Sequence, residues 1–182
     1  MFPAWDSDLF KFINTAHAEP LDLIMIMLSN KYIWIPLYLY IIKKLVDQHK
    51  KEAWKSILYI SSTVILADQI ASSVLKPIFK RLRPCHVEAF QSWIHLPDGC
   101  GGMYGFCSSH AANSFALAMA VSILSQNKWI GNLLFFWAFM IAYSRIYLGA
   151  HYPLDVLVGA ILGILGSLIL KKILYDKLIK NA

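Results

Sequence analysis

Two histidines in the second half of the chain stand beside residue types that phosphate chemistry uses. His110 follows a pair of serines, Ser108 and Ser109, and His151 precedes Asp155 by four positions. An imidazole can act as a nucleophile or as a general acid, and a carboxylate bound to one ring nitrogen leaves the other nitrogen free to react. The spacing therefore points to nucleophilic or acid–base chemistry at His151, with Asp155 as its partner.

Basic residues accompany both histidines. Six residues separate Lys76 from Arg83, and Arg145 precedes His151 by six positions. A helix that starts at Ser108 would also present free backbone N–H groups and the positive end of its dipole, which bind anions. Cations and backbone N–H groups of this kind can hold the oxygens of a phosphate group.

Each of these features has a second, purely structural interpretation. Basic residues at the ends of membrane helices are commonly anchors whose charged groups reach the interface. A serine before a helix is an N-cap, and Asp155, two residues after Pro153, can cap the helix that follows. His110 can be an interfacial histidine without a chemical role. Both interpretations stay open when each segment is considered alone.

The composition predicts a helical membrane protein. Of the 182 residues, 58% are hydrophobic and 15% are charged, and the mean hydropathy is +0.52, so polar side chains are too few to cover a soluble globule. We predict an all-α integral membrane bundle that forms a single domain over residues 1–182. Five apolar stretches are long enough to cross a bilayer, at about 30–46, 54–76, 109–126, 129–148 and 154–175.

Residues 1–29 differ from these spans. Apolar residues such as Leu9 and Phe12 alternate with polar residues such as Asp6, which favours an amphipathic helix lying in the membrane interface. The apolar run 21–28 is too short to span a bilayer alone, so a sixth, broken or re-entrant span remains an alternative. Early acidic residues and the lack of an uninterrupted apolar core argue against a cleavable signal peptide.

The distribution of basic residues predicts the orientation. Ten of the seventeen would share one side, which the positive-inside rule makes cytoplasmic: Lys43, Lys44, Lys50, Lys51, Lys55, Lys128, Lys171, Lys172, Lys177 and Lys180. Because these lysines flank apolar runs, the net charge of +6 reflects membrane topology and does not indicate nucleic acid binding. All three arginines and the longest non-helical stretch, an extracytoplasmic loop at 81–107, then lie on the opposite side.

Taken together, the segments resemble the three-part signature of the type 2 phosphatidic acid phosphatase superfamily, which includes membrane lipid phosphatases and vanadium haloperoxidases. That signature is K-x6-RP, PSGH and SR-x5-H-x3-D; this chain has KPIFKRLRP from Lys76, CSSH from Cys107 and SRIYLGAHYPLD from Ser144. The first and third segments match at every fixed position. In the second, Cys107 replaces proline and Ser109 replaces glycine, which puts a Cβ where backbone approaches phosphate.

The resemblance implies a phosphatase that uses neither a metal nor a cofactor. His151 would attack phosphorus and form a phosphohistidine, while Asp155 orients the ring and His110 protonates the leaving group. The phosphate oxygens would be held by Lys76, Arg83, Ser108, Ser109 and Arg145.

The substrate implied is a lipid phosphate or diphosphate at the headgroup level of a bacterial inner membrane, with the active site facing the periplasm. From the sequence we favour undecaprenyl diphosphate, with phosphatidylglycerol phosphate, phosphatidic acid and lipid A as alternatives. The membrane spans disfavour a haloperoxidase. A protein that only binds or transports anionic lipids would explain the arginines but not the spacing of the histidines and the aspartate. The sequence does not indicate the oligomeric state.

Two further features bear on the site. Asp68 recurs with Ser72 and Lys76 every four residues, so the three share a helix face, and Asp68 is a candidate for positioning Lys76 or a neighbouring arginine. A packing role for Asp68 is the alternative. Glycines at 159, 163 and 166 fit either close helix packing or a groove for a lipid tail.

The three cysteines all fall on the predicted outer side, which is oxidising in a bacterial envelope. Cys107 adjoins the predicted phosphate-binding segment. The favoured disulfide therefore joins Cys85 and Cys100.

Overall fold

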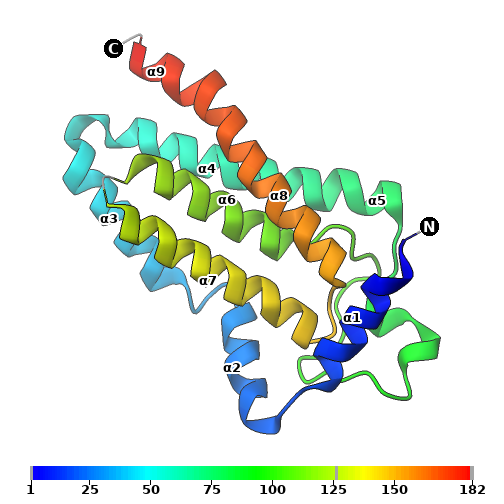
Figure 1. The fold of residues 1–182 in the computed structure, drawn as a ribbon. Helices are drawn as coiled ribbons and strands as arrows, with labels where there is room; N and C mark the ends of the chain where they lie inside the picture. The colour runs from blue at the N-terminus through cyan, green and yellow to red at the C-terminus, as the bar shows by residue number, and fades with distance from the viewer. Residues whose placement is uncertain (1, 126, 181–182) are drawn as a thin grey trace.

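The computed structural model describes residues 2–125 and 127–180, and its long elements are all α-helices, as the sequence predicts. The bundle consists of α3 (Ile35–His49), α4 (Ala53–Gln69), α6 (Ser109–Leu124), α7 (Lys128–Tyr147) and α8 (Pro153–Leu170). Figure 1 shows these helices lengthwise beside one another, with α1 and the green loop before α6 gathered at one end. Helix α6 is central, because it packs against α4, α7 and α8.

Two helical stretches continue beyond their α-helical parts. After α4 the chain passes through a π-helical segment, Ile70–Leu75 (η2), into α5 (Lys76–Phe79). It leaves this helix at Lys80, whose φ of 46° is left-handed. Helix α8 continues in the same way through Lys171–Tyr175 (η5) into α9 (Asp176–Lys180). Lys76 therefore stands at the end of the continuous helix that carries Asp68.

The helices follow the predicted spans to within a few residues, apart from the start of the first. Residues 31–34 form turns, and α3 begins at Ile35, next to a proline that suits a helix start. Residue 126, the last of the third predicted span, lies outside the described residues, as do residues 1 and 181–182 of the predicted domain.

Length and composition qualify three helical stretches to cross a membrane: Ile35–Phe79, Lys128–Tyr147 and Pro153–Leu178. The first of these contains the hairpin of α3 and α4, which turns at Lys50–Glu52 (Figure 1). Helix α6 is apolar but shorter. The count of five spans stays a prediction.

Two of the glycines in α8 allow α6 and α8 to approach closely. A Cβ at Gly159 would lie 2.5 Å from the carbonyl oxygen of Ser108. A Cβ at Gly163 would meet the carbonyl oxygen of Ala112 and lie 2.7 Å from the backbone nitrogen of Ala116. Close packing is therefore the correct explanation for these two glycines, whereas no atom lies within 4 Å of the corresponding position at Gly166.

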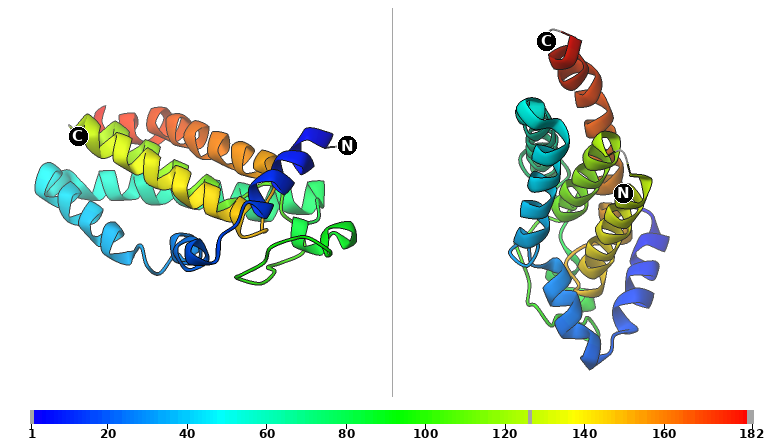
Figure 2. Two further views of the ribbon diagram at one scale, coloured as in Figure 1. Left: turned by 60° about the horizontal axis from the view of Figure 1, so that its bottom comes forward. Right: turned by 90° about the vertical axis from the view of Figure 1, so that its left-hand side faces the viewer.

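The N-terminal segment forms two helices, α1 (Ala4–Thr15) and α2 (Glu19–Ser29), at the same end of the bundle as the 81–107 loop (Figure 2, left). The apolar side chains of Trp5, Leu9 and Phe12 are exposed on α1, as an interfacial helix requires. Its buried side carries Asp6 and Asn14, each 0% exposed. These two polar residues of the interfacial helix therefore face the protein and not the solvent, because both have partners inside it.

The 81–107 loop is non-helical apart from two single turns, Pro84–His86 (η3) and Glu88–Phe90 (η4). Its two ends lie side by side, because Leu82 and Tyr104 form an antiparallel bridge. The backbone N–H of Arg83 donates to Met103 at 3.0 Å, and that of Gly105 donates to Arg81 at 2.8 Å. The loop is thus an ordered part of the fold.

Substituting the glycines of α8 tests the close packing. We expect Gly163→Ala to destabilise the protein by about 1–3 kcal/mol, because its methyl group meets the backbone of α6. Gly166→Ala is the matched control and should be neutral or slightly stabilising, since its methyl group meets no atom and alanine favours a helix. Thermal unfolding in detergent measures both variants. Equal unfolding temperatures would contradict the packing interpretation.

Candidate active site

His151 lies in the short connection between α7 and α8, and its side chain is buried. Its backbone N–H donates to the carbonyl of Arg145 at 3.2 Å, which folds the connection back on the end of α7. Its Nδ1 atom lies 3.6 Å from Oδ2 of Asp155, longer than a hydrogen bond but within ion-pairing distance. Nδ1 thus faces the carboxylate, and Nε2 is the ring nitrogen left for a reaction.

Asp155 has the capping role and also lies beside His151. It stands in the first turn of α8, where its Oδ2 atom accepts the backbone N–H of Tyr152 at 3.1 Å. Its Oδ1 atom accepts a hydrogen bond from Arg81 at 2.6 Å. The predicted hydrogen bond between Asp155 and His151 is not formed, because the Asp155 oxygens accept from Arg81 and from the backbone N–H of Tyr152 instead.

The start of α6 supplies the second histidine. Ser108 caps this helix, since its side chain accepts from the backbone N–H of Ala111. The backbone N–H of Ser108 donates to the carbonyl oxygen of Asp155 at 2.9 Å, which joins the start of α6 to the start of α8. His110 follows in the first turn, half-buried, so the two histidines come from neighbouring helix starts.

Ser109, which stands where the family signature has glycine, holds Lys76. The Nζ atom of Lys76 donates to Oγ of Ser109 at 2.7 Å, and Ser72 lies 2.8 Å from the same oxygen. The end of the continuous α4–α5 helix is thereby tied to the start of α6. The Cβ that replaces glycine is accommodated, and the hydroxyl it carries orients one of the predicted phosphate ligands.

Arg83 and Gly105 lie close to His151, the predicted nucleophile. A Cβ at Gly105 would lie 3.1 Å from Oδ2 of Asp155, 3.2 Å from Cγ of Arg83 and 3.5 Å from Nδ1 of His151. The absence of a side chain at Gly105 therefore lets Arg83 approach His151. The Nε atom of Arg83 also donates to the carbonyl of Tyr104 at 3.3 Å.

Arg145 enters the site from α7 and is buried. One Nη atom donates to the hydroxyl of Ser29 at the end of α2. Its Nε atom has no hydrogen-bond partner within the described part of the chain. A buried guanidinium with an unpaired N–H is a suitable donor for a phosphate oxygen.

The positive charges of the site act together on His151. Burial lowers the pKa of His151 well below its usual value, and the charges of Arg83, Arg145 and Lys76 lower it further. The imidazole is therefore neutral at physiological pH and keeps a lone pair for attack. The three cations among the predicted phosphate ligands, far apart in the sequence, thus converge on the predicted nucleophile.

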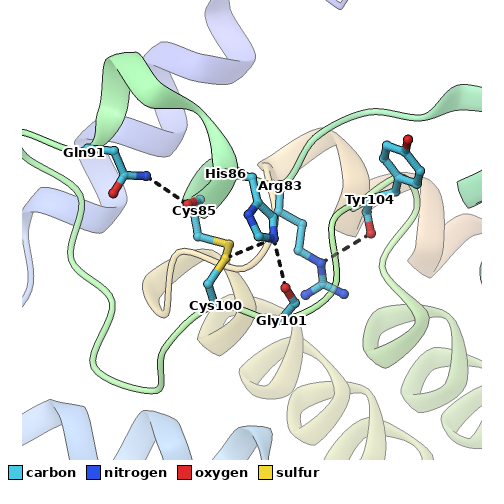
Figure 3. Close-up of a disulfide and its surroundings, with 7 residues drawn as sticks. All are labelled: Arg83, Cys85, His86, Gln91, Cys100, Gly101 and Tyr104. Carbon is cyan, nitrogen blue, oxygen red and sulfur yellow. Dashed lines mark hydrogen bonds between the residues drawn. A yellow bond between two sulfur atoms is a disulfide. The ribbon is translucent and has the colours of Figure 1, made fainter.

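Cys85 and Cys100 form a disulfide, the pairing that the sequence favours. Figure 3 shows the disulfide next to Arg83, whose guanidinium lies near Gly101 and Tyr104 in the second half of the loop. Cys107 is a buried free thiol, and burial raises its pKa to about 11. Cys107 is thus a protonated, inert side chain beside the phosphate-binding segment.

An apolar groove of about 680 Å³ begins at Ser109 and His110 and runs between α3, α4, α6 and α7. Most of its lining is apolar, including Trp34, Leu117 and Trp137. Its dimensions are those of a ligand site. The groove therefore gives an apolar molecule access to the general-acid candidate.

Asp68 lies in this groove. Its Oδ1 atom accepts a hydrogen bond from Nδ2 of Asn113 at 2.9 Å, and both side chains line the cavity. Within the described residues, no hydrogen bond or ion pair joins Asp68 to Lys76 or to an arginine. The direct partner of Asp68 is thus a residue that the sequence did not single out.

Two residues near the nucleophile were missed by sequence reasoning. Arg81 was grouped with the outer basic residues, and Asp6 with the polar residues of an interfacial helix, yet both are buried next to Asp155. A signal was present for Asp6, since Asp6, Phe10 and Asn14 recur every four residues and must share one helix face. Nothing in the sequence distinguishes Arg81 from its basic neighbours.

The family model of the PAP2 superfamily matches residues 56–179. The lipid A 4'-phosphatase of Bacteroides thetaiotaomicron is 39% identical over an alignment of 167 positions that covers 89% of this chain and 73% of that protein. The lipid A 4'-phosphatase of Porphyromonas gingivalis is 31% identical, over 94% of this chain and 74% of its own length. The undecaprenyl-diphosphatase of Sulfolobus acidocaldarius is also 31% identical, with coverages of 86% and 72%.

Among solved structures, Aquifex aeolicus LpxE superimposes with a TM-score of 0.74 at 28% identity, covering 93% of this chain and 96% of that one. The chain therefore belongs to the PAP2 superfamily. It is an enzyme, a membrane phosphatase of that superfamily.

Removing the disulfide tests whether it supports the phosphate site. The bond closes a loop with a sequence separation of 15, so a Cys85→Ser/Cys100→Ser variant should lose about 3 kcal/mol of stability. Its KM should rise, because Arg83 lies two residues from the bond. Dithiothreitol should reproduce both effects in the wild type and have no further effect on the variant. Unchanged KM and unfolding temperature would show that the loop is held without the bond.

Proposed function

We propose that this enzyme removes a phosphate group from a lipid by way of a phosphohistidine, and that its substrate is lipid A or a lipid of that type. The observation that carries the lipid assignment is the apolar groove that begins at Ser109 and His110. A phosphate bound by the cations would leave the attached hydrocarbon chains at the mouth of this groove. Lipid tails bury apolar surface there, which favours binding of the whole lipid over a water-soluble phosphate ester.

The first step would be attack by the neutral His151. Its Nε2 lone pair forms the N–P bond as the bond from phosphorus to the lipid oxygen breaks, and His110 donates a proton to that oxygen. Lys76, Arg83 and Arg145 would stabilise the negative charge on the remaining phosphate oxygens. A water molecule, deprotonated by His110, would then break the N–P bond and release inorganic phosphate.

Two observations favour lipid A over undecaprenyl diphosphate, the substrate favoured from sequence alone. The lipid A 4'-phosphatase of Bacteroides thetaiotaomicron is 39% identical to this chain, against 31% for the undecaprenyl-diphosphatase of Sulfolobus acidocaldarius. The groove also contains polar acceptors, because one Asp68 oxygen and the buried Oδ1 of Asn113 have no hydrogen-bond partner within the described residues. Lipid A carries amide and hydroxyl donors on its acyl chains, whereas an undecaprenyl chain is a hydrocarbon and leaves buried acceptors unpaired.

We further propose that the active site faces the periplasm from the inner membrane. The site is built at the end of the bundle that carries α1, α2 and the 81–107 loop (Figure 1). Most lysines lie toward the opposite end, the cytoplasmic one under the positive-inside rule. A disulfide at the site is compatible with an oxidising compartment.

Phosphate release from a panel of lipids tests the reaction and the substrate together. The purified wild type should release phosphate from lipid A in excess EDTA, and less from undecaprenyl diphosphate, phosphatidylglycerol phosphate and phosphatidic acid. His151→Ala should lose at least about 1,000-fold in rate, because no other group can form the intermediate. Release from none of these lipids by folded wild-type protein would favour a lipid-binding or transport role. A strong preference for undecaprenyl diphosphate would restore that substrate to first place.

Substituting Asp68 tests the polar part of the groove. With Asp68→Asn we expect kcat/KM for lipid A to fall about 10-fold, since an acceptor for the lipid is weakened, while undecaprenyl diphosphate changes less than about twofold. Ser61→Ala, in the lining of the same groove, is the control and should leave both values unchanged. Equal losses on both lipids would instead support the role of positioning Lys76. Full activity on both would remove Asp68 from the function.

A further inference from the structure

Arg81 is buried between two carboxylates. One Nη atom donates to Oδ1 of Asp155 at 2.6 Å, and the other donates to Oδ2 of Asp6 at 2.5 Å. Both carboxylates are 0% exposed. The flat faces of the guanidinium are covered as well, because its Cζ atom lies 4.0 Å from the ring centre of Phe2 and 3.7 Å from that of Tyr152. Arg81 is therefore fixed at its polar edge and on both faces.

The charge of this cluster is not balanced within it. Two carboxylates share one guanidinium, so one negative charge remains, and Oδ2 of Asp155 is the oxygen that lies 3.6 Å from His151. The imidazole becomes positively charged as it bonds to phosphorus, while Lys76, Arg83 and Arg145 oppose that charge. An Asp155 fully neutralised by Arg81 would give less support to the charged ring. Because Asp6 shares the guanidinium, Asp155 keeps part of its negative charge for His151.

Helix α1 brings Asp6 to this position and clamps the connection that carries His151. The second oxygen of Asp6 accepts the backbone N–H of Leu154 at 2.8 Å, in the first turn of α8. Phe10, one turn later, packs its ring 5.4 Å from that of Tyr152. Asn14, a further turn on, donates to the carbonyl of Tyr147 at 2.7 Å. The buried side of α1 thus contacts the chain on both sides of the nucleophile.

We infer that Asp6 and Arg81 are positioning residues for catalysis, which act on His151 through Asp155. Arg81 fixes one oxygen of Asp155 so that the other faces the imidazole, and Asp6 prevents Arg81 from neutralising that carboxylate. The N-terminal helix is then part of the catalytic apparatus as well as an interfacial element. This inference rests on the proposed phosphohistidine mechanism.

The test compares isosteric variants with controls on neighbouring exposed residues, all in the full-length protein. Asp6→Asn keeps the size of the side chain and can still accept from Leu154, and Asp8→Asn on the exposed side of α1 is its control. Arg81→Gln removes the charge, Arg81→Lys keeps it, and the exposed Lys80→Gln is their control. For each variant, kcat and KM are measured on the best lipid substrate, together with the thermal unfolding temperature.

We expect Asp6→Asn and Arg81→Gln to lower kcat by at least about 10-fold with KM within about twofold, since phosphate binding is not touched. Arg81→Lys should recover part of the loss, and both controls should match the wild type. The double variant Asp6→Asn/Arg81→Gln should be no slower than Arg81→Gln alone, because Asp6 acts through Arg81. Because contacting residues can also be non-additive in stability, unchanged unfolding temperatures are needed to separate this non-additivity in kcat from destabilisation.

Three results would overturn the inference. The first is a wild-type kcat in Asp6→Asn, which is the deciding variant if Arg81→Gln does not fold. The second is a double variant whose loss in kcat is the product of the two single losses. The third is a rise in KM with kcat unchanged in the single variants. Failure of the proposed function is a different result, since wild type and both controls would then release no phosphate, or His151→Ala would remain active.

Discussion

The close contact between α6 and α8 is the constraint on which the site depends. Gly159 and Gly163 let the two helices approach until backbone meets backbone, and the N–H of Ser108 then reaches the carbonyl oxygen of Asp155. This single hydrogen bond sets the start of α6 beside the start of α8. His110 lies in the first turn of α6 and His151 two residues before α8, so helix packing sets the positions of both.

Electrostatics makes the site a receptor for an anion. Lys76, Arg83 and Arg145 converge on a buried, neutral histidine, and like charges held together in a poorly solvated place repel one another. A phosphate group would relieve that repulsion and pair with the free N–H of Arg145. Donors that are fixed before the substrate arrives do not have to reorganise as charge develops, which is how such a cluster accelerates phosphoryl transfer.

The elements that hold these charges in place are mostly not membrane spans. Ser29 of α2 binds Arg145, Ser109 binds Lys76, and the bridged ends of the 81–107 loop hold Arg83. Helix α1 contributes through Asp6 and Asn14. Residues 2–29 and the loop thus form a cap at one end of the bundle (Figure 2). The candidate active site lies where this cap meets the helix ends.

The sequence by itself determined the helical membrane class, the approximate helices and the candidate residues of the site. Apolar stretches of fixed length and the spacing of histidines, aspartate and basic residues are local properties, so they can be read along the chain. The Cys85–Cys100 disulfide could also be predicted from the sequence, because three cysteines allow only three pairings. Tertiary structure alone decided that Arg81 pairs with Asp6 and Asp155, and that Asp68 binds Asn113. It alone also decided that Asp6 and Asn14 bind backbone groups of Leu154 and Tyr147. Each of these contacts joins residues 45 to 148 positions apart in the chain, and buried polar groups choose partners by three-dimensional proximity, which local sequence patterns do not encode.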